Sequence, residues 1–509
     1  MKANNNISDM TFKQNELNNL LSKSNDKIAD LENKLIKKDK QIKLLNEELK
    51  KLNDSVTNIT SIKSDSLNLN VIKDEGILEI NENITISKEL SSEQNELFKK
   101  MNSTAENMFI TGKAGTGKSY LLKYFKKYTS KKVLYAAPTG IAALNIEGVT
   151  LHSAFGWNNL IDDSEIKLSK NKIELLKSLD TLIIDEISMV RVDVFNQIDK
   201  ILKEANKNNN PFGGKQVILF GDLFQLPPVA KKEECEYFND KYGGIFFFNS
   251  PAYNNGDFKF YELKEIFRQT DKHFKSILNN IRIGKINDED LNSLNEHIVD
   301  EVPRRVVQIV PKKDEANQIN SDNLNKLDTQ EYEYHANILV GEDKIKETDF
   351  PCDFDLHLKV GSLIMMITND QEHKRWVNGT LGIVSELSPT KIKVTINGTE
   401  FEISPVPFNK YKCEYDREEK KLKYIVEASV SQFPVILAYA ITIHKSQGMT
   451  YQQIACNLDS CFAPGQAYVA LSRCANYDKL YLTSKVNPGS IITDNVVTNF
   501  YNDVNKEGK

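Results

Sequence analysis

Apolar residues recur every seven positions near the start of the chain. They occupy two positions of a heptad between residues 17 and 59. One position holds Leu21, Ile28, Leu35, Ile42, Leu49 and Val56, and the other holds Leu17, Leu31, Leu45, Leu52 and Ile59. Ser24 and Lys38 interrupt the pattern. About six heptads without Pro or Gly predict a coiled coil over residues 1–60. Such a stripe must be covered, so residues 17–59 predict self-association or a coiled-coil partner. A single amphipathic helix packed on the rest of the chain remains the alternative.

Beyond a polar stretch at 61–86, which is expected to be a linker, the pattern changes to short apolar runs that alternate with helical segments. The predicted strands are "NMFIT" (107–111), "VLYAAP" (133–138), "TLIID" (181–185), "QVILFGD" (216–222), "VVQIVP" (306–311), "PVILAYA" (434–440) and "LYLTS" (480–484). This alternation predicts an α/β fold with doubly wound parallel sheets. Within 355–430, short alternating strands and the turns "VNGT" and "INGT" predict a small β-rich module inserted before the last strands.

The most apolar segment, "FPVILAYAITI" (433–443), ends abruptly in polar side chains. If Val435–Ile443 is one strand buried on both faces of a parallel sheet, His444–Gln447 lie beyond its carboxyl end, where ligands of open α/β sheets bind. From this stretch alone, a strand that simply surfaces into a polar loop is an equal alternative.

Composition narrows the class of protein. The 509 residues are 40% hydrophobic and contain no apolar run long enough to cross a membrane, and "MKANNNISDM" lacks the core of a signal peptide. A soluble, intracellular protein with no membrane association is therefore expected. Six scattered cysteines without CxxC spacing indicate neither a disulfide framework nor a metal site. The net charge of −5 leaves the partners open, because a basic channel can lie within that total.

A phosphate-binding loop is predicted at "GKAGTGKS" (112–119), which follows a strand and opens a helix. Gly112, Gly115 and Gly117 allow the backbone N–H groups around Thr116 to close on phosphates. Lys118 meets the β- and γ-phosphate charge, and the Ser119 hydroxyl ligates Mg²⁺.

Asp185 ends the strand "TLIID", Glu186 follows it directly, and one glutamine follows the next strand. We expect Asp185 to hold the Mg²⁺ shell and Glu186 to act as the general base for the attacking water. Gln225 in "GDLFQLPPV" (221–229) is placed to contact the γ-phosphate, or it caps the Pro227–Pro228 turn; spacing does not choose.

At this point the chain resembles the Pif1-like helicases of superfamily 1 and, more distantly, the RecD-type helicases. The resemblance runs from about residue 90 to 485. Its motifs are, besides those above, "APTGIAA" (137–143), "TLHSAFGW" (150–157), "LIIDEISM" (182–189), "IFRQ" (266–269), "VNGTLGIV" (377–384), "AITIHKSQGMT" (440–450) and "AYVALSRC" (467–474). The heptads at 17–59 are outside the resemblance.

The resemblance implies two RecA-like domains that hold ATP between them, with a small SH3-like insertion in the second. The implied boundaries are 87–255 for the first domain, 256–350 with 431–509 for the second, and 351–430 for the insertion. Arg268 and Arg473 resemble the arginines presented to the γ-phosphate by the second domain. Gln94 in "LSSEQ" would recognise adenine, although Ser91 and Gln94 also form a capping box.

The same resemblance implies single-stranded DNA and single-strand/duplex junctions as partners. "TIHKSQG" would join the ATP cleft to the DNA track, with Lys445 suited to a phosphate of either ligand and Gln447 to a polar contact near the γ-phosphate. With His444, the expected DNA contacts are Thr139, His152 and Phe155, and Phe155 is equally compatible with the core.

These expectations describe an ATP-dependent, Mg²⁺-requiring DNA helicase that moves 5′ to 3′ on single strands and displaces the paired strand. The alternative is a DNA-stimulated ATPase that acts as a switch or loading factor through its coiled coil without unwinding. A structural protein with a relic nucleotide site is a weaker alternative, because Lys118, Asp185, Glu186, Arg268 and Arg473 are all present.

Overall fold

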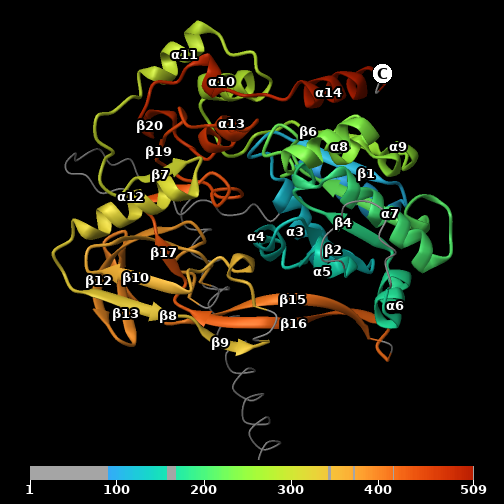
Figure 1. Ribbon diagram of the computed structural model, residues 1–509, viewed down its shortest axis with the longest axis horizontal. Coiled ribbons are helices and arrows are strands. Elements are labelled where there is room, and N and C mark those ends of the chain that lie inside the picture. The colour runs from blue at the N-terminus through green and yellow to red at the C-terminus, as the bar shows by residue number, and fades with distance from the viewer. Residues whose placement is uncertain (1–89, 157–167, 342–344, 371–372, 417, 508–509) are drawn as a thin grey trace, which may run out of the picture. The chain divides into compact units, whose positions relative to one another are not determined.

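The computed structural model describes residues 90–156, 168–341, 345–370, 373–416 and 418–507 (Figure 1). The predicted coiled coil at 1–60 and the linker at 61–86 lie outside these residues. No helix in the described ranges is both long and apolar enough to cross a membrane.

The first sheet has six strands in the order β3-β2-β4-β5-β1-β6, and every neighbouring pair is parallel. Its central strands are buried throughout, because helices cover both faces, which explains their continuous apolar runs. The strands are β1 (Met108–Gly112), β2 (Val133–Ala137), β3 (Val149–Thr150), β4 (Thr181–Ile184), β5 (Gln216–Phe220) and β6 (Lys259–Leu263).

Among the described residues, eight α-helices accompany this sheet. They are α2 (Ser92–Ser103), α3 (Lys118–Tyr128), α4 (Gly140–Asn145), α5 (Leu151–Phe155), α6 (Lys170–Ser178), α7 (Val192–Asn206), α8 (Lys232–Tyr242) and α9 (Pro251–Asn255).

The second sheet has four parallel strands in the order β18-β7-β19-β20. The strands are β7 (Val307–Val310), β18 (Ala440–Thr442), β19 (Ile454–Cys456) and β20 (Leu480–Leu482). The helices that follow the first sheet in the chain are α10 (Lys272–Arg282), α11 (Asp288–Asn295), α12 (Lys313–Asn325), α13 (Gln466–Leu471) and α14 (Asn495–Glu507). The two parallel sheets confirm the expected α/β class.

A β-rich region lies in the chain between β7 and β18. A five-stranded antiparallel sheet has the order β14-β13-β12-β11-β17, a long hairpin of β15 and β16 pairs with β9, and β8 pairs with β10. The strands are β8 (Glu331–His335), β9 (Asn337–Val340), β10 (Asp355–Lys359), β11 (Leu363–Met366), β12 (Leu381–Ser388), β13 (Lys391–Ile396), β14 (Thr399–Ile403), β15 (Val406–Asp416), β16 (Lys421–Gln432) and β17 (Val435–Leu437).

The apolar run 433–443 is not one strand, and that prediction was wrong. β17 pairs antiparallel with β11 in the β-rich region, whereas β18 pairs parallel with β7 in the second sheet. The run therefore passes from the five-stranded antiparallel sheet to the second sheet. It is uniformly apolar because each of the two sheets buries its part of the run. β18 still ends just before His444, so the polar cluster does follow the carboxyl end of a parallel strand.

The sheets also differ from the expected boundaries. β6 pairs with β1, so the first sheet extends past residue 255 to Leu263. The β-rich region starts before 351, since β8 and β9 belong to it, and it continues past 430 to β17.

The last helix, α14, follows the second sheet in the chain but packs on the core of the first (Figure 1). Val497 and Tyr501 are buried there, and the Phe500 ring stacks on Phe248 with a centroid distance of 4.3 Å. Residues 495–507 therefore close the first sheet's core rather than the second.

Candidate nucleotide and DNA site

The loop between β1 and α3 is shaped by glycines with left-handed backbone. Gly115 has φ +81° and Gly117, which precedes the first residue of α3, has φ +79°. A Cβ built on Gly115 would lie 2.6 Å from the Arg268 Cβ, so a side chain is excluded on steric grounds as well. The loop therefore brings its backbone next to the segment that carries Arg268.

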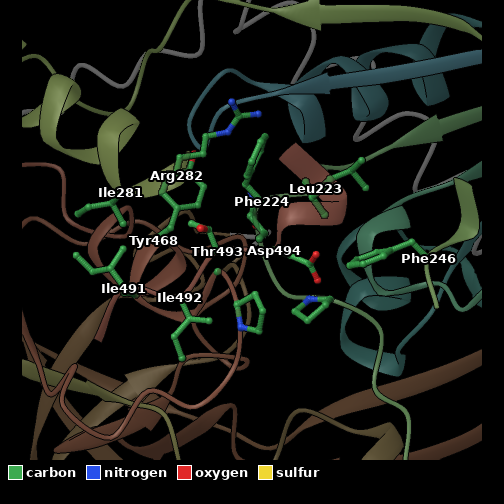
Figure 2. Close-up of a pocket in the computed structure, with 16 residues that line it drawn as sticks. Leu223, Phe224, Phe246, Ile281, Arg282, Tyr468, Ile491, Ile492, Thr493 and Asp494 are labelled. Carbon is green, nitrogen blue, oxygen red and sulfur yellow. The ribbon is translucent and has the colours of Figure 1, made fainter. Parts of the chain in front are cut away.

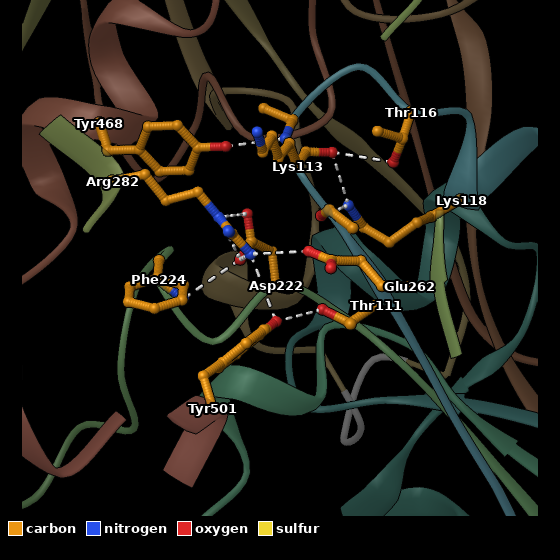
Figure 3. A network of polar contacts seen from close by, with 12 residues as sticks. Thr111, Lys113, Thr116, Lys118, Asp222, Phe224, Glu262, Arg282, Tyr468 and Tyr501 are labelled. Carbon is orange, nitrogen blue, oxygen red and sulfur yellow. Dashed lines mark hydrogen bonds and ion pairs between the residues drawn. The ribbon is translucent and has the colours of Figure 1, made fainter. Parts of the chain in front are cut away.

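Lys118 begins α3 and points back into this loop. Its Nζ donates to the carbonyl oxygens of Gly112 at 2.6 Å and Lys113 at 3.1 Å, and the Thr116 hydroxyl donates to Lys113 O at 2.9 Å (Figure 3). Burial lowers the pKa of Lys118, and the Asp222 carboxylate opposes that shift. Ser119 is exposed on the first turn of α3, beside this ammonium in the sequence.

Asp185 and Glu186 follow β4 directly. Asp185 is buried, and its Oδ1 accepts a hydrogen bond from the Glu186 N–H at 3.0 Å. Glu186 has φ +50°, in the left-handed region that residues other than glycine seldom adopt. Burial raises the pKa of both carboxyl groups, and Lys118 opposes the shift at each.

Arg268 and Arg473 are brought together next to the loop. Arg268 Nη1 donates to Ser472 O at 3.0 Å, and Arg473, which is 2% exposed, donates from Nε to Val469 O at 2.9 Å. Burial lowers the pKa of both guanidinium groups, and the charge of Arg473 lowers the pKa of Arg268 further. Glu186 is the charge that most favours ionised Arg473, so this arginine lies near the expected base.

Gln94 forms the capping box of α2. The Gln94 N–H donates to Ser91 Oγ at 3.3 Å, and the Ser91 N–H donates to Gln94 Oε1 at 3.2 Å. The Gln94 amide also donates to Thr116 O at 3.3 Å, in the phosphate-binding loop. The capping alternative is confirmed, and the same side chain touches the loop.

Gln225 and Gln447 follow strands of different sheets, β5 and β18. Gln225 is 8% exposed and lines a small pocket together with Phe224, Arg282 and Tyr468, which Figure 2 labels. Gln447 follows β18, and its Nε2 is buried without a hydrogen-bond partner among the described residues. Leaving a buried donor without an acceptor costs free energy, because the group has given up its hydrogen bonds to water.

A buried polar network joins three further elements behind the loop (Figure 3). Arg282 from α10 donates to Asp222 Oδ1 at 3.0 Å and to the Tyr501 hydroxyl at 3.3 Å, and that hydroxyl lies 2.6 Å from Thr111 Oγ1. Asp222 raises the pKa of Arg282 and keeps it charged. The strand that ends in the phosphate-binding loop is thereby tied to α10 and α14.

One hydrogen bond links the loop to α13, and two more link Gln269 to the residues that follow α13. The Ala114 N–H donates to the Tyr468 hydroxyl at 2.8 Å, and Gln269 Nε2 donates to Ser472 O at 3.0 Å and to Cys474 O at 2.8 Å. "AYVALSRC" therefore contacts the nucleotide loop through its tyrosine as well as presenting Arg473.

The residues expected to contact DNA from the first sheet and its helices differ in how exposed their side chains are. Thr139 caps α4, since its Oγ1 accepts from the Ala142 N–H at 3.2 Å, and His152 is exposed on α5. Phe155 is fully buried in the core of the first sheet. The proposed base-stacking role of Phe155 was wrong, because it faces inward from a short helix and the ring presents no face to a base.

His444 and Lys445 form the start of the turn after β18. His444 is exposed, and the Lys445 N–H donates to Thr442 Oγ1 at 3.2 Å. Lys445 Nζ lies 3.7 Å from Asp353 Oδ1, a partly exposed ion pair with the segment between β9 and β10. Such a pair is weak, so the ammonium is available to exchange partners.

Four buried residues around the loop escaped sequence reasoning: Asp222, Arg282, Tyr468 and Tyr501. Asp222 and Tyr468 lie inside motifs quoted above, so their position was a usable signal. Arg282 and Tyr501 gave no such signal. Arg282 lies 60 residues after Asp222 and Tyr501 lies 279 residues after it, so their role depends on contacts that only the folded chain brings about.

Comparison with known proteins agrees with this arrangement. The family model described as PIF1-like helicase matches residues 89–292. A protein named ATP-dependent DNA helicase Pif1 from Bdellovibrio bacteriovorus is 34% identical over 424 residues, which cover 81% of this chain and 92% of that protein.

Two solved structures of Pif1 from Bacteroides sp are 38% identical to this chain. The complex with ADP-AlF4 has a TM-score of 0.76, and the form bound to ssDNA has a TM-score of 0.61; each comparison covers 82% of this chain and 98% of the solved one. With the shared motifs placed around one phosphate-binding loop, the chain belongs to the Pif1-like helicase family.

Proposed function

We propose that this chain is an ATP-dependent DNA helicase that moves 5′ to 3′ on single-stranded DNA and displaces the paired strand. One observation carries the proposal. Lys118, Arg268 and Arg473 are brought together at one glycine-shaped loop, and burial lowers the pKa of each. Cations in such surroundings favour a polyanion, and a nucleotide triphosphate supplies it.

The residues present fit ATP with Mg²⁺. Asp185 and Ser119 offer the hard oxygen ligands that Mg²⁺ prefers, and they would hold it. Bound there, the ion neutralises charge that develops on the β- and γ-phosphates. Gly112, Gly115, Thr116 and Gly117 would line the phosphates, and Gln94, which touches Thr116, would contact the base.

The roles of the chain's own side chains follow from their positions. Glu186 accepts a proton from the attacking water, and burial raises its pKa, which makes the carboxylate a stronger base. Arg268 and Arg473 stabilise charge on the transferred phosphoryl group. Gln447, with its unpaired buried Nε2, and Gln225 report the state of that group to the neighbouring elements.

The proposed architecture is two RecA-like domains that act on ATP from both sides, with an SH3-like insertion and an N-terminal coiled coil. Single-stranded DNA and single-strand/duplex junctions are the proposed substrates. The DNA backbone is bound by Thr139 and His152, which belong to the first sheet and its helices, and by His444 and Lys445, which follow β18 of the second sheet. Lys445 exchanges Asp353 for a DNA phosphate, because the present ion pair is half exposed.

Strand displacement on duplexes with either a 5′ or a 3′ single-stranded tail tests the proposal. With ATP and Mg²⁺, the protein is expected to open the 5′-tailed duplex only. Glu186→Gln, the matched control, keeps ATP and DNA binding but stalls, because the base is lost while Asp185 remains.

Lys118→Ala is expected to lose hydrolysis and to keep nucleotide-free DNA binding. Normal turnover by Lys118→Ala would contradict the assignment of the loop. If DNA stimulated ATP hydrolysis but neither duplex opened, the switch or loading-factor alternative would replace the helicase.

A further inference from the structure

A tyrosine of α13 holds a backbone group in the middle of the phosphate-binding loop (Figure 3). The Ala114 N–H donates to the Tyr468 hydroxyl at 2.8 Å, and the two residues are 6% and 3% exposed. Burial raises the pKa of Tyr468, so its hydroxyl stays neutral near neutral pH. The bond therefore adds no negative charge beside a loop that is proposed to bind a triphosphate.

A second hydrogen bond holds the next residue of the loop. The Phe267 N–H donates to Gly115 O at 2.9 Å, and a Cβ built on Gly115 would lie 2.6 Å from the Arg268 Cβ. Two neighbouring loop residues are thus bonded to two separate segments, Ala114 to α13 and Gly115 to the segment that carries Arg268. The bond at Ala114 is made by a side chain, that of Tyr468, so a substitution can remove it.

Hydrogen bonds at the end of α13 connect these two segments to each other. The Ser472 N–H donates to Tyr468 O at 3.0 Å, and Ser472 O accepts from Arg268 Nη1 at 3.0 Å. The next residue, Arg473, continues this turn, since its N–H donates to Ala470 O at 3.1 Å. The backbone position of Arg473 therefore follows that of α13, which Tyr468 bonds to the loop.

The hydroxyl oxygen is the part of Tyr468 that makes this bond. A phenylalanine would fill nearly the same space but would leave the Ala114 N–H buried without an acceptor, which costs free energy. The loop or α13 would then have to move for that N–H to regain a partner. A group that stabilises charge on a transferred phosphoryl group must be placed accurately, and a small displacement slows the reaction.

We propose that Tyr468 is a positioning residue for ATP hydrolysis, whose hydroxyl sets the place of Arg473 relative to the phosphate-binding loop. This inference rests on the proposed function. Tyr468 acts through Arg473 and does not itself touch the reacting atoms. Because the bond joins the loop to α13, a change in the shape of the loop when nucleotide binds is passed on to Arg473.

The first test is DNA-stimulated ATP hydrolysis by full-length Tyr468→Phe. Arg473 is proposed to act on the transition state, so kcat should fall about five- to tenfold, as the loss of one hydrogen bond predicts. KM should stay within about twofold, because the interactions that bind the nucleotide remain.

The second test repeats this substitution in a protein that lacks the arginine. Single-turnover hydrolysis, with protein in excess over ATP, is compared for Arg473→Ala and for Arg473→Ala with Tyr468→Phe. If Tyr468 acts through Arg473, the added substitution should change the rate by less than about twofold. A merely structural role of Tyr468 would instead give the same loss with and without Arg473.

The matched control is Tyr477→Phe, which also removes a hydrogen-bonded hydroxyl. Tyr477 Oη lies 2.8 Å from Ser293 Oγ, on elements that make no bond to the loop among the described residues. Its kcat should stay within about twofold of the unchanged protein. Circular dichroism and thermal unfolding of both variants check that each is folded at the temperature of the assay.

The outcomes separate this role from the proposed function. An unchanged kcat for folded Tyr468→Phe, or an equal loss in the presence and absence of Arg473, would overturn the role of Tyr468 and leave the proposed helicase standing. Absence of ATP hydrolysis by the unchanged protein with DNA and Mg²⁺ would refute the proposed function, and the role of Tyr468 with it.

Discussion

Buried side chains of both charges lie at the nucleotide loop, and each charge lowers the stability of the protein when no ligand neutralises it. Asp185 is the clearest case, because burial raises its pKa above the ordinary value of 3.8. The folded protein holds this proton over a pH range in which the unfolded chain has released it. The ionised carboxylate therefore costs stability until a cation joins it.

Replacing Asp185 by Asn should stabilise the protein in the absence of Mg²⁺. The sign follows from the raised folded pKa: the cost is small near pH 4, grows as pH rises above 3.8, and is complete above the folded pKa. Thermal unfolding with EDTA should show the variant melting higher at pH 8, with a smaller gain at pH 4.5. Asp257→Asn, on an exposed turn, should show no such trend; equal gains at both pH values would argue against the buried charge.

Phe155 tests the distinction between core and DNA contact. Because the ring is fully buried, Phe155→Ala should lower the free energy of unfolding by about 3–5 kcal/mol. Affinity for single-stranded DNA, measured by fluorescence anisotropy at a temperature where the variant is folded, should stay within about twofold. Lost affinity at unchanged stability would return Phe155 to the DNA surface.

At the scale of elements, α13 approaches the turn after β5 closely. Gly465 precedes α13 with φ +76°, and a Cβ there would lie 2.3 Å from Gln225 O and 2.5 Å from Phe224 O. Backbone on both sides cannot yield as a flexible side chain does. This glycine therefore sets how near α13, which Arg473 follows in the chain, comes to the first sheet.

Gly465→Ala should push these elements apart and reduce DNA-stimulated ATP hydrolysis by at least tenfold. Its control is Gly398→Ala, which has a similar φ of +80° but nothing within 4 Å of the added Cβ. Both variants carry the left-handed penalty of roughly 1–2 kcal/mol, so the difference reports the clash. Equal hydrolysis by the two variants would show that the approach is not needed for turnover.

Sequence reasoning was strongest where a local pattern carried the information. The fully buried strands β1, β2, β4 and β5, and the loop before α3, all follow from short runs and spacings. It failed for 433–443, because a run buried by two different sheets has the same composition as one long strand. It also missed β6, whose edge position gives a mixed pattern, and the role of α14, which depends on long-range contacts.

For the whole molecule, the heptads at 17–59 predict a dimer. The full chain should sediment at twice the mass of the chain, and a variant lacking residues 1–60 should sediment as a monomer with its ATP hydrolysis retained. Alternate core positions changed to Lys, such as Leu35→Lys with Ile42→Lys, provide a full-length control that should also be monomeric. A full chain that is monomeric in isolation would leave the coiled-coil partner as the remaining prediction.

The packing of α14 on the first sheet has a consequence for the order of assembly during synthesis. The chain leaves the ribosome from its N-terminus at about 5–20 residues per second, so β6 emerges tens of seconds before Tyr501 does. Throughout that interval Thr111 and Arg282 lack the hydroxyl that joins them. The core of the first sheet therefore keeps an open apolar face until residues 495–507 have been synthesised.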